Sequence, residues 1–313
     1  MTMALAFDVG LVALLIAMAV LAIFARDNVS AAIAFAVYGL LLALAWVRLA
    51  AVDVALTEAA IGSGVTGMLL LGAAARLRSS ENNLTQPSLL LRCCAGVFCA
   101  LIAVGLAAIT VIGSEPFPTL APMAMASLAE SGLGNPVAGV LFVYRALDTL
   151  LEKVVLLLAL LGVWSVASDR AWGGVPSLRP YAQANDILVF LAQTLPPIGI
   201  MVGIYMCWVG ANQPGGAFQG GAILAAMWLL VMMAGLQQVP PIGSRRMRLL
   251  LVIGPVTFLA VGLAGFVLAD GFLAYPAGFA KPLIIVVEVA LTLSIGVTLG
   301  LLVAGPPERT QPP

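Results

Sequence analysis

Hydrophobic residues occur along this chain in long runs that short polar segments separate. A helix of about 20 apolar residues crosses a hydrocarbon core of roughly 30 Å. The pattern therefore predicts an all-α, polytopic transmembrane protein of about nine helices. The candidate spans lie near residues 5–25, 30–50, 53–75, 90–112, 145–168, 187–210, 217–236, 248–269 and 282–304.

Two polar connections, at residues 77–89 and 169–186, divide the nine spans into groups of three, two and four. We expect three modules with the boundaries 1–79, 88–170 and 183–305. A further polar stretch, residues 113–134, is expected to be an irregular extracytoplasmic loop. The chain shows no internal repeat, which argues against a self-sufficient carrier built from two matching halves.

The arginines indicate an orientation. An odd number of spans places the termini on opposite sides, and an outside N-terminus leaves only Arg48 and Lys281 clearly outside. Basic residues prefer the cytoplasmic side, so we expect the N-terminus outside and the C-terminus in the cytoplasm. The basic residues then placed in the cytoplasm are Arg26, Arg76, Arg78, Arg92, Arg170, Arg179, Arg245, Arg246, Arg248 and Arg309.

Composition excludes several functions. Hydrophobic residues make up 62% of the chain and charged residues 9%, and the 14 basic and 14 acidic residues cancel. A nucleic-acid partner is not expected, because phosphate binding needs clustered positive charge. The chain has no histidine, and its four cysteines lack paired CxxC spacing. We therefore expect no metal site, no cofactor and no enzymatic chemistry.

The third span carries the first candidate site. Asp53 lies at the expected membrane edge and Thr57 one turn further along the same face, while Glu58 is about 100° round the helix and deeper. An ionisable group within a bilayer needs a partner, a proton or water, so Glu58 is a candidate for an ion path. The alternative is a tightly packed helix in which a protonated Glu58 only donates a hydrogen bond.

The same span is rich in small residues. Ala59, Ser63 and Gly67 recur at every fourth position, which allows a neighbouring helix to approach closely. The glycine density also favours local unwinding or a π-bulge.

The fifth span begins with a charged cluster. Arg145, Asp148 and Glu152 are spaced to stack along one helical stripe, and Lys153 points partly away from it. Such a ladder of alternating charges can relay a proton or cation inward. The alternative is a charged collar at the membrane interface.

Two further features complete the set of candidates. Lys281 and Glu288 share a face of the last span but are roughly 10 Å apart, too far to pair directly. Glu288 lies deep enough to need a partner on another helix, either in a structural hydrogen bond or in an ion path. Between the sixth and seventh spans, a proline and two glycine pairs predict a tight helical hairpin, and an anion or partner site there is the other reading. The hairpin residues are Asn212, Pro214, Gly215, Gly216, Gly220 and Gly221.

Three segments, in order, resemble parts of the Mrp-type multisubunit cation/proton antiporters and the related membrane-bound hydrogenases. The sequence DVALTEAAIGSG, residues 53–64, resembles the acidic helix of the D-like hydrogenase module, which is similar to a membrane component of respiratory complex I. Residues 144–152 resemble the YRxxDTxxE pattern of the E-like module. Residues 193–221 resemble the B-like module of the antiporters, with its hairpin of the form NxPGGGFxGG.

The resemblance implies a non-enzymatic, multi-pass component of a prokaryotic cell membrane complex. Its partners would be other membrane subunits, including large antiporter-like ones, together with the lipid bilayer, monovalent cations such as Na⁺, and protons. Glu58 and the Arg145, Asp148 and Glu152 cluster would line part of an ion path. The alternative role is a structural membrane adaptor in a complex I-like or hydrogenase-like redox-driven ion pump.

Overall fold

The computed structural model describes residues 2–77, 88–113, 119–178 and 186–308, and these residues are almost entirely helical. The expected all-α class is confirmed. One short antiparallel pair, β1 (Val175–Pro176) with β2 (Pro307–Glu308), is the only sheet in these ranges. The principal helices are α1 (Thr2–Phe24), α2 (Asn28–Arg48), α3 (Val52–Thr57), η1 (Glu58–Val65), α4 (Thr66–Leu77), α5 (Leu89–Ile112), α6 (Ala121–Ser127), α7 (Pro136–Gly139), η4 (Val140–Tyr144), α8 (Ala146–Ser165), α9 (Asp186–Val209), α10 (Ala217–Met233), α11 (Arg245–Leu268) and α12 (Ala280–Ala304).

Seven helices of the described chain are long and apolar enough to cross a membrane. One of them is the continuous rod of α3, η1 and α4, residues 52–77. The two other expected spans are also helices but differ in character. α8 carries three charged side chains in its first half, and α10 has 17 residues, fewer than the roughly 20 that a straight crossing needs.

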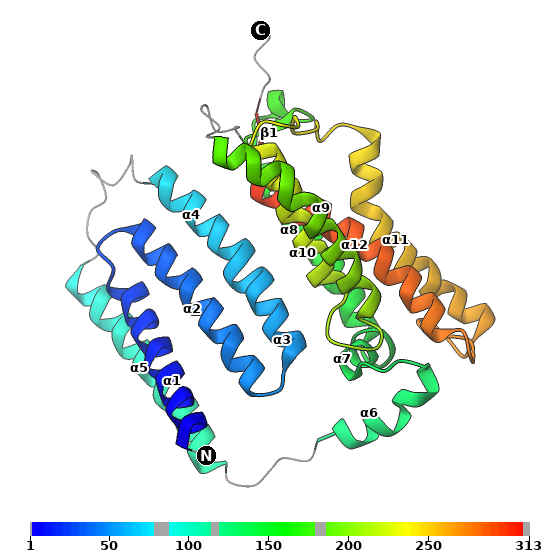
Figure 1. Ribbon diagram of the computed structural model, residues 1–313, viewed down its shortest axis with the longest axis horizontal. Helices are drawn as coiled ribbons and strands as arrows, with labels where there is room; N and C mark the ends of the chain where they lie inside the picture. Colours follow the sequence, from blue (N-terminus) through cyan, green and yellow to red (C-terminus); the bar gives the residue numbers. More distant parts are fainter. Residues whose placement is uncertain (1, 78–87, 114–118, 179–185, 309–313) are drawn as a thin grey trace.

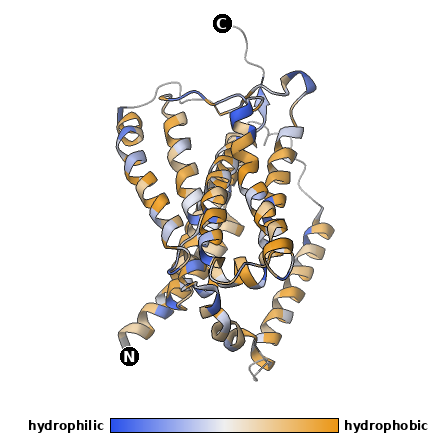
Figure 2. Ribbon diagram, turned by 90° about the vertical axis from the view of Figure 1, so that its right-hand side faces the viewer, coloured by the Kyte–Doolittle hydropathy of each residue, from blue (hydrophilic) through white to orange (hydrophobic). Residues whose placement is uncertain are grey.

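The long helices form two groups (Figure 1). α1, α2 and α4 pack together in one, and α9, α10, α11 and α12 in the other. The groups meet where α10 contacts α3 and η1. The main core surrounds α12, whose Val287, Leu291 and Ile295 are almost completely buried. Hydrophobic residues occupy most of the length of the helices (Figure 2), and many large ones are exposed, as a lipid-facing surface requires.

Small residues set the packing of the first group, as the sequence predicts. The Ser63 hydroxyl donates a 2.6 Å hydrogen bond to the Ala36 carbonyl of α2, and Gly39 lies directly against Ser63. Gly67 faces Ala36 in the same way. The expected π-bulge is confirmed and is long, because the π-helix η1 extends over eight residues. Close backbone approach, rather than large apolar side chains, joins α2 to this rod.

This contact gives a stability prediction. A Cβ atom placed on Gly39 would lie 3.0 Å from the Ser63 Cβ, so Gly39→Val should force α2 away from η1. We expect the free energy of unfolding to fall by about 1–3 kcal/mol, the usual effect of overpacking. Thermal unfolding of the purified chain measures it. Gly72→Val is the matched control, because a Cβ at Gly72 meets nothing within 4 Å; equal losses in both variants would contradict the account.

Two connections are more ordered than the sequence suggested. The expectation of an irregular loop over residues 113–134 is wrong for residues 121–131, which form α6 and the 3₁₀ turn Leu128–Ser131. In the connection after α8, β1 pairs with β2 at the other end of the chain, and the Ile242 amide donates to the Gly174 carbonyl at 3.0 Å. Residues 78–87, 114–118, 179–185 and 309–313, with Arg78, Arg179 and Arg309, lie outside the described ranges.

Candidate functional site

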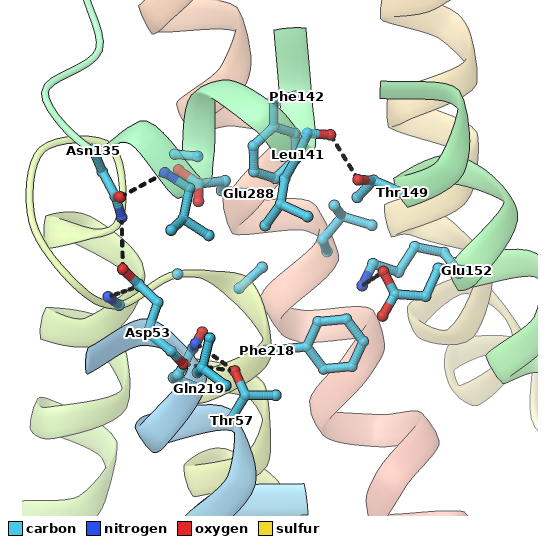
Figure 3. Close-up of a pocket in the computed structure, with 18 residues that line it drawn as sticks. Asp53, Thr57, Asn135, Leu141, Phe142, Thr149, Glu152, Phe218, Gln219 and Glu288 are labelled. Carbon is cyan, nitrogen blue, oxygen red and sulfur yellow. Dashed lines mark hydrogen bonds and ion pairs between the residues drawn. The ribbon is translucent and has the colours of Figure 1, made fainter. Parts of the chain in front are cut away.

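A cavity of about 260 Å³ lies where the two groups of helices meet (Figure 3). Its walls come from α3, α7, η4, α8, the hairpin before α10, the first turn of α10, and α12. Asp53, Glu152 and Glu288 all line it, although they belong to the third, fifth and last expected spans. Lys153 lines it as well. The fold thus brings together acidic residues that the sequence presents as three separate candidates.

Asp53 forms a hydrogen bond with the hairpin that joins α9 to α10. The residue is only 9% exposed and packs inside the protein. Its Oδ1 accepts a 2.9 Å hydrogen bond from the Gly215 amide. Gly216 next to it has a φ of +128°, a conformation that favours glycine and turns the chain back into α10. The Gly215 amide of the tight hairpin is therefore satisfied by a carboxylate of this chain.

Asn135 fastens the other side of the hairpin, and sequence reasoning missed it. Its Nδ2 donates to the Gly210 and Gln213 carbonyls at 3.0 Å each and reaches the Asp53 Oδ2 at 3.5 Å. Its Oδ1 accepts from the Val137 amide at 2.9 Å and caps α7. The pair Asn135-Pro136 is a typical helix-start signal, so the cap was visible in the sequence although its long-range partners were not.

Thr57 and Gln219 link α3 to α10. The Thr57 hydroxyl donates to the Asp53 carbonyl at 2.9 Å and accepts from the Gln219 Nε2 at 3.0 Å. Gly220 and Gly221 follow, and both allow close helix packing as expected, Gly220 against Gly203 of α9 and Gly221 against Ile295 of α12. Gln219 is a second site residue that sequence reasoning missed.

The charged cluster of the fifth span divides between two environments. Arg145 and Asp148 pair with each other on the surface, with side chains 71% and 55% exposed, and neither lines the cavity. Glu152 is 51% exposed at the cavity wall. Lys153 points away from their stripe, as expected, but into the interior, where it is 3% exposed. Of this charged segment, only Glu152 and the neighbouring Lys153 reach the cavity.

Glu288 lies on the opposite wall, in α12, and is 2% exposed. Its Oε2 has no hydrogen-bond partner among the described residues. Lys281 does not pair with it, as expected; its Nζ donates instead to the Asn212 side chain at 2.7 Å. Tyr275, in the loop between α11 and α12, also has a buried hydroxyl without a partner in the described chain. Burial, and then the charge of Glu288, raise the pKa of Tyr275.

Glu58 is separate from this site. It begins η1, is half-buried, and its carboxylate lies against Gly62 of its own helix. It follows Thr57 directly, but it does not line the cavity. Sequence analysis favoured Glu58, the deeper acid of this span, as the ion-path candidate. In the structure it is Asp53 that lines the cavity.

Comparison with known proteins identifies the two ends of the chain. Residues 13–79 match the MbhD family of MBH, and residues 187–305 match a domain related to the MnhB subunit of a Na⁺/H⁺ antiporter. The structure is similar to a chain in the Mrp complex from Dietzia sp. DQ12-45-1b, with a TM-score of 0.71 and 26% identity over 97% of this chain. The chain is an Mrp-related, multi-pass membrane subunit.

This Mrp-related subunit spans 35% of the matched Dietzia chain. It is also 28% identical over 168 residues to an uncharacterized protein of Methanocaldococcus jannaschii, covering 46% of this chain and 64% of that protein. Its fold resembles a chain of the membrane-bound sulfane sulfur reductase, an archaeal respiratory membrane complex, with a TM-score of 0.57 and 23% identity. That likeness covers 69% of this chain and 97% of the other.

Proposed function

We propose that this protein is a membrane subunit of a multisubunit Mrp-type cation/proton antiporter, or of a related membrane-bound complex, in a prokaryotic cell membrane. Its role is to contribute the carboxylates of Asp53, Glu152 and Glu288 to an ion path. The observation that carries the proposal is the meeting of these three acids, from three distant segments, on one cavity.

The free-energy cost of placing charged side chains in a bilayer supports the proposed ion path. A charged side chain inside a bilayer is unfavourable by a few kcal/mol or more, so ionisable groups there face a partner or a hydrated cavity. The cavity is large enough for several water molecules. Its polar wall residues include Thr57, Asn135 and Gln219, which supply hydroxyl and amide groups that can hold water. An ion or proton would therefore pass beside carboxylates without entering lipid.

The route would continue beyond the cavity in two directions. Glu58, half-buried and next to Thr57, extends it along η1. Glu152 opens toward the surface of the chain, close to the exposed pair of Arg145 and Asp148. We propose that this charged surface faces a large antiporter-like subunit, which would remove the charges from contact with lipid.

The proposed topology has nine crossings in three modules of three, two and four helices, with the N-terminus outside. The end of α4, the start of α11 and strand β1 lie toward the same side of the molecule (Figure 1). Arg76 belongs to the first of these and Arg245, Arg246 and Arg248 to the second. A shared side rich in arginine is the pattern of a cytoplasmic face.

Replacing Glu152 tests the ion path. Glu152→Gln keeps the size of the side chain and removes the charge at the cavity wall, so the complex should assemble while cation-dependent proton movement in everted vesicles falls to background. Glu130→Gln is the matched control, because Glu130 is an exposed acid outside the cavity. Undiminished exchange in the Glu152 variant would rule out the path.

The second candidate is a structural adaptor in a redox-driven pump, which the fold likeness to the sulfane sulfur reductase chain favours. An adaptor would tolerate neutral substitutions at the three acids. Bulky residues at Ser63, Gly67 or Gly220, where helices pack closely, would instead dissociate the assembly. Co-purification of the partner subunits with each class of variant separates the two functions.

A further inference from the structure

Two side-chain oxygens from different helices converge beside Gly216. The position that a Cβ atom would take on Gly216 lies 3.4 Å from the Gln219 Oε1 and 3.5 Å from the Glu288 Oε1. Because glycine has no side chain, this position is open. Gln219 lines the cavity from the first turn of α10, and Glu288 lines it from α12. The hairpin therefore leaves room for a small guest between a carboxamide oxygen and a carboxyl oxygen.

Both oxygens are available to such a guest. The Gln219 Nε2 donates to the Thr57 hydroxyl at 3.0 Å, which leaves the Oε1 of the same amide for the open position. Glu288 is 2% exposed, and its Oε2 has no hydrogen-bond partner among the described residues. A carboxyl group buried in this way needs either a proton or a positive charge beside it.

The acidic residues of the cavity outnumber its basic ones. Its acidic wall residues are Asp53, Glu152 and Glu288, and its one basic wall residue in the described chain is Lys153. The Lys153 Nζ lies 3.7 Å from the Glu152 Oε2 and 3.2 Å from the centroid of the Phe218 ring, so its charge is already compensated. Asp53 accepts only neutral amides, which do not cancel its charge. A cation that approaches Glu288 therefore meets an excess of negative charge and is attracted.

The two oxygens suit a monovalent metal cation. Carbonyl and carboxyl oxygens can replace part of the hydration shell of such an ion, and water in the cavity can supply the rest. One uncompensated carboxylate matches one positive charge. A divalent ion is not expected, because no three Asp, Glu, Cys or His side chains of the described chain lie close enough to share a metal.

We propose that the open position beside Gly216 is a binding site for Na⁺ or K⁺, with the Glu288 Oε1 and the Gln219 Oε1 as its protein ligands. The inference rests on the proposed ion path and adds the place where a cation is held in it. A bound ion neutralises the buried carboxylate of Glu288. It also contacts a side chain that joins α10 to α3, because Gln219 donates to Thr57.

Cation binding by the full chain in lipid nanodiscs tests this site. Thermal unfolding is followed while NaCl or, separately, KCl replaces choline chloride at constant ionic strength, since a ligand that binds only the folded state raises the Tm in a saturable way. The native chain should show this rise with at least one of the two salts, and Glu288→Gln should abolish it. Gln219→Leu removes one neutral ligand and should raise the half-saturating concentration about tenfold. Glu130→Gln is the matched control, because it removes an exposed acid outside the cavity.

The absence of a saturable rise with both salts in the native chain would overturn the proposal. So would a native rise in a folded Glu288→Gln. If that variant does not fold, Gln219→Leu replaces it, and a native half-saturating concentration there overturns the site. Failure of the proposed function is a different result, because it appears as undiminished ion movement by the assembled complex carrying Glu152→Gln. The two ideas can therefore fail independently.

Discussion

Replacing Glu288 with glutamine should stop cation-dependent proton movement by the assembled complex. Glutamine keeps the shape of the side chain but cannot take up or release a proton, and the buried Oε2 is a wall oxygen without a partner among the described residues. We expect a loss of at least about 100-fold, because a single positioned proton-transfer group commonly contributes that much. Proton movement in everted vesicles, normalised to the amount of complex, measures it.

Thr298→Val is the control for this variant. Thr298 is as deeply buried in α12 as Glu288, but its hydroxyl donates to the Ser294 carbonyl of its own helix and it does not line the cavity. Its replacement should leave exchange close to the native rate. If the Glu288 variant exchanges protons as fast as the Thr298 variant, Glu288 is only a packing residue.

Two substitutions at Asp53 should separate its charge from its hydrogen bond. Asp53→Ala leaves the Gly215 amide without its acceptor, which should lower the free energy of unfolding by about 1.5–3 kcal/mol, the usual effect of losing a hydrogen bond to a charged group. Asp53→Asn keeps an oxygen that can accept this bond, so most of the stability should remain. Both variants remove the negative charge from the cavity, and both should abolish cation-dependent proton movement.

The measurements are thermal unfolding of the purified chain and exchange in vesicles. If Asp53→Asn exchanges ions normally, the role of Asp53 is only to stabilise the hairpin through its hydrogen bond to Gly215. An alanine variant as stable as the native chain would contradict the hairpin contact itself.

The sequence predicts the helices well because each span carries its own evidence. A run of about 20 apolar residues needs no knowledge of the rest of the chain, and the recurrence of Ser63 and Gly67 indicates a close helix contact by spacing alone. The π-helix could be anticipated from glycine density in the same way. These properties are local, and the structure agrees with them.

The cavity could not be predicted, because it depends on contacts between residues far apart in the chain. Asp53 and Gly215 are 162 positions apart, and Asn135 joins both regions. Helical geometry places Lys153 on a different face from Glu152, but only the packing of α8 against α12 decides which face is inside. Spacing alone therefore favoured the stripe with more charges, which lies on the surface.

The hairpin gives the clearest example of a partial prediction. Proline and paired glycines indicate a tight turn with free amides, and an anion or partner site was the other reading of that pattern. The turn is tight, and its Gly215 amide donates to the Asp53 carboxylate of the same chain. No local signal identified that anion as Asp53, more than half the chain away.

The central claim is that Asp53, Glu152 and Glu288 surround a hydrated space through which a proton or cation passes. A density map of the assembled complex, at a resolution that shows ordered water, tests it most directly. We predict water molecules within hydrogen-bonding distance of all three carboxyl groups, continuous with the surface beside Glu152. A dry cavity, or one filled by an apolar side chain of a neighbouring protein, would contradict the claim and leave this chain a role in membrane architecture alone.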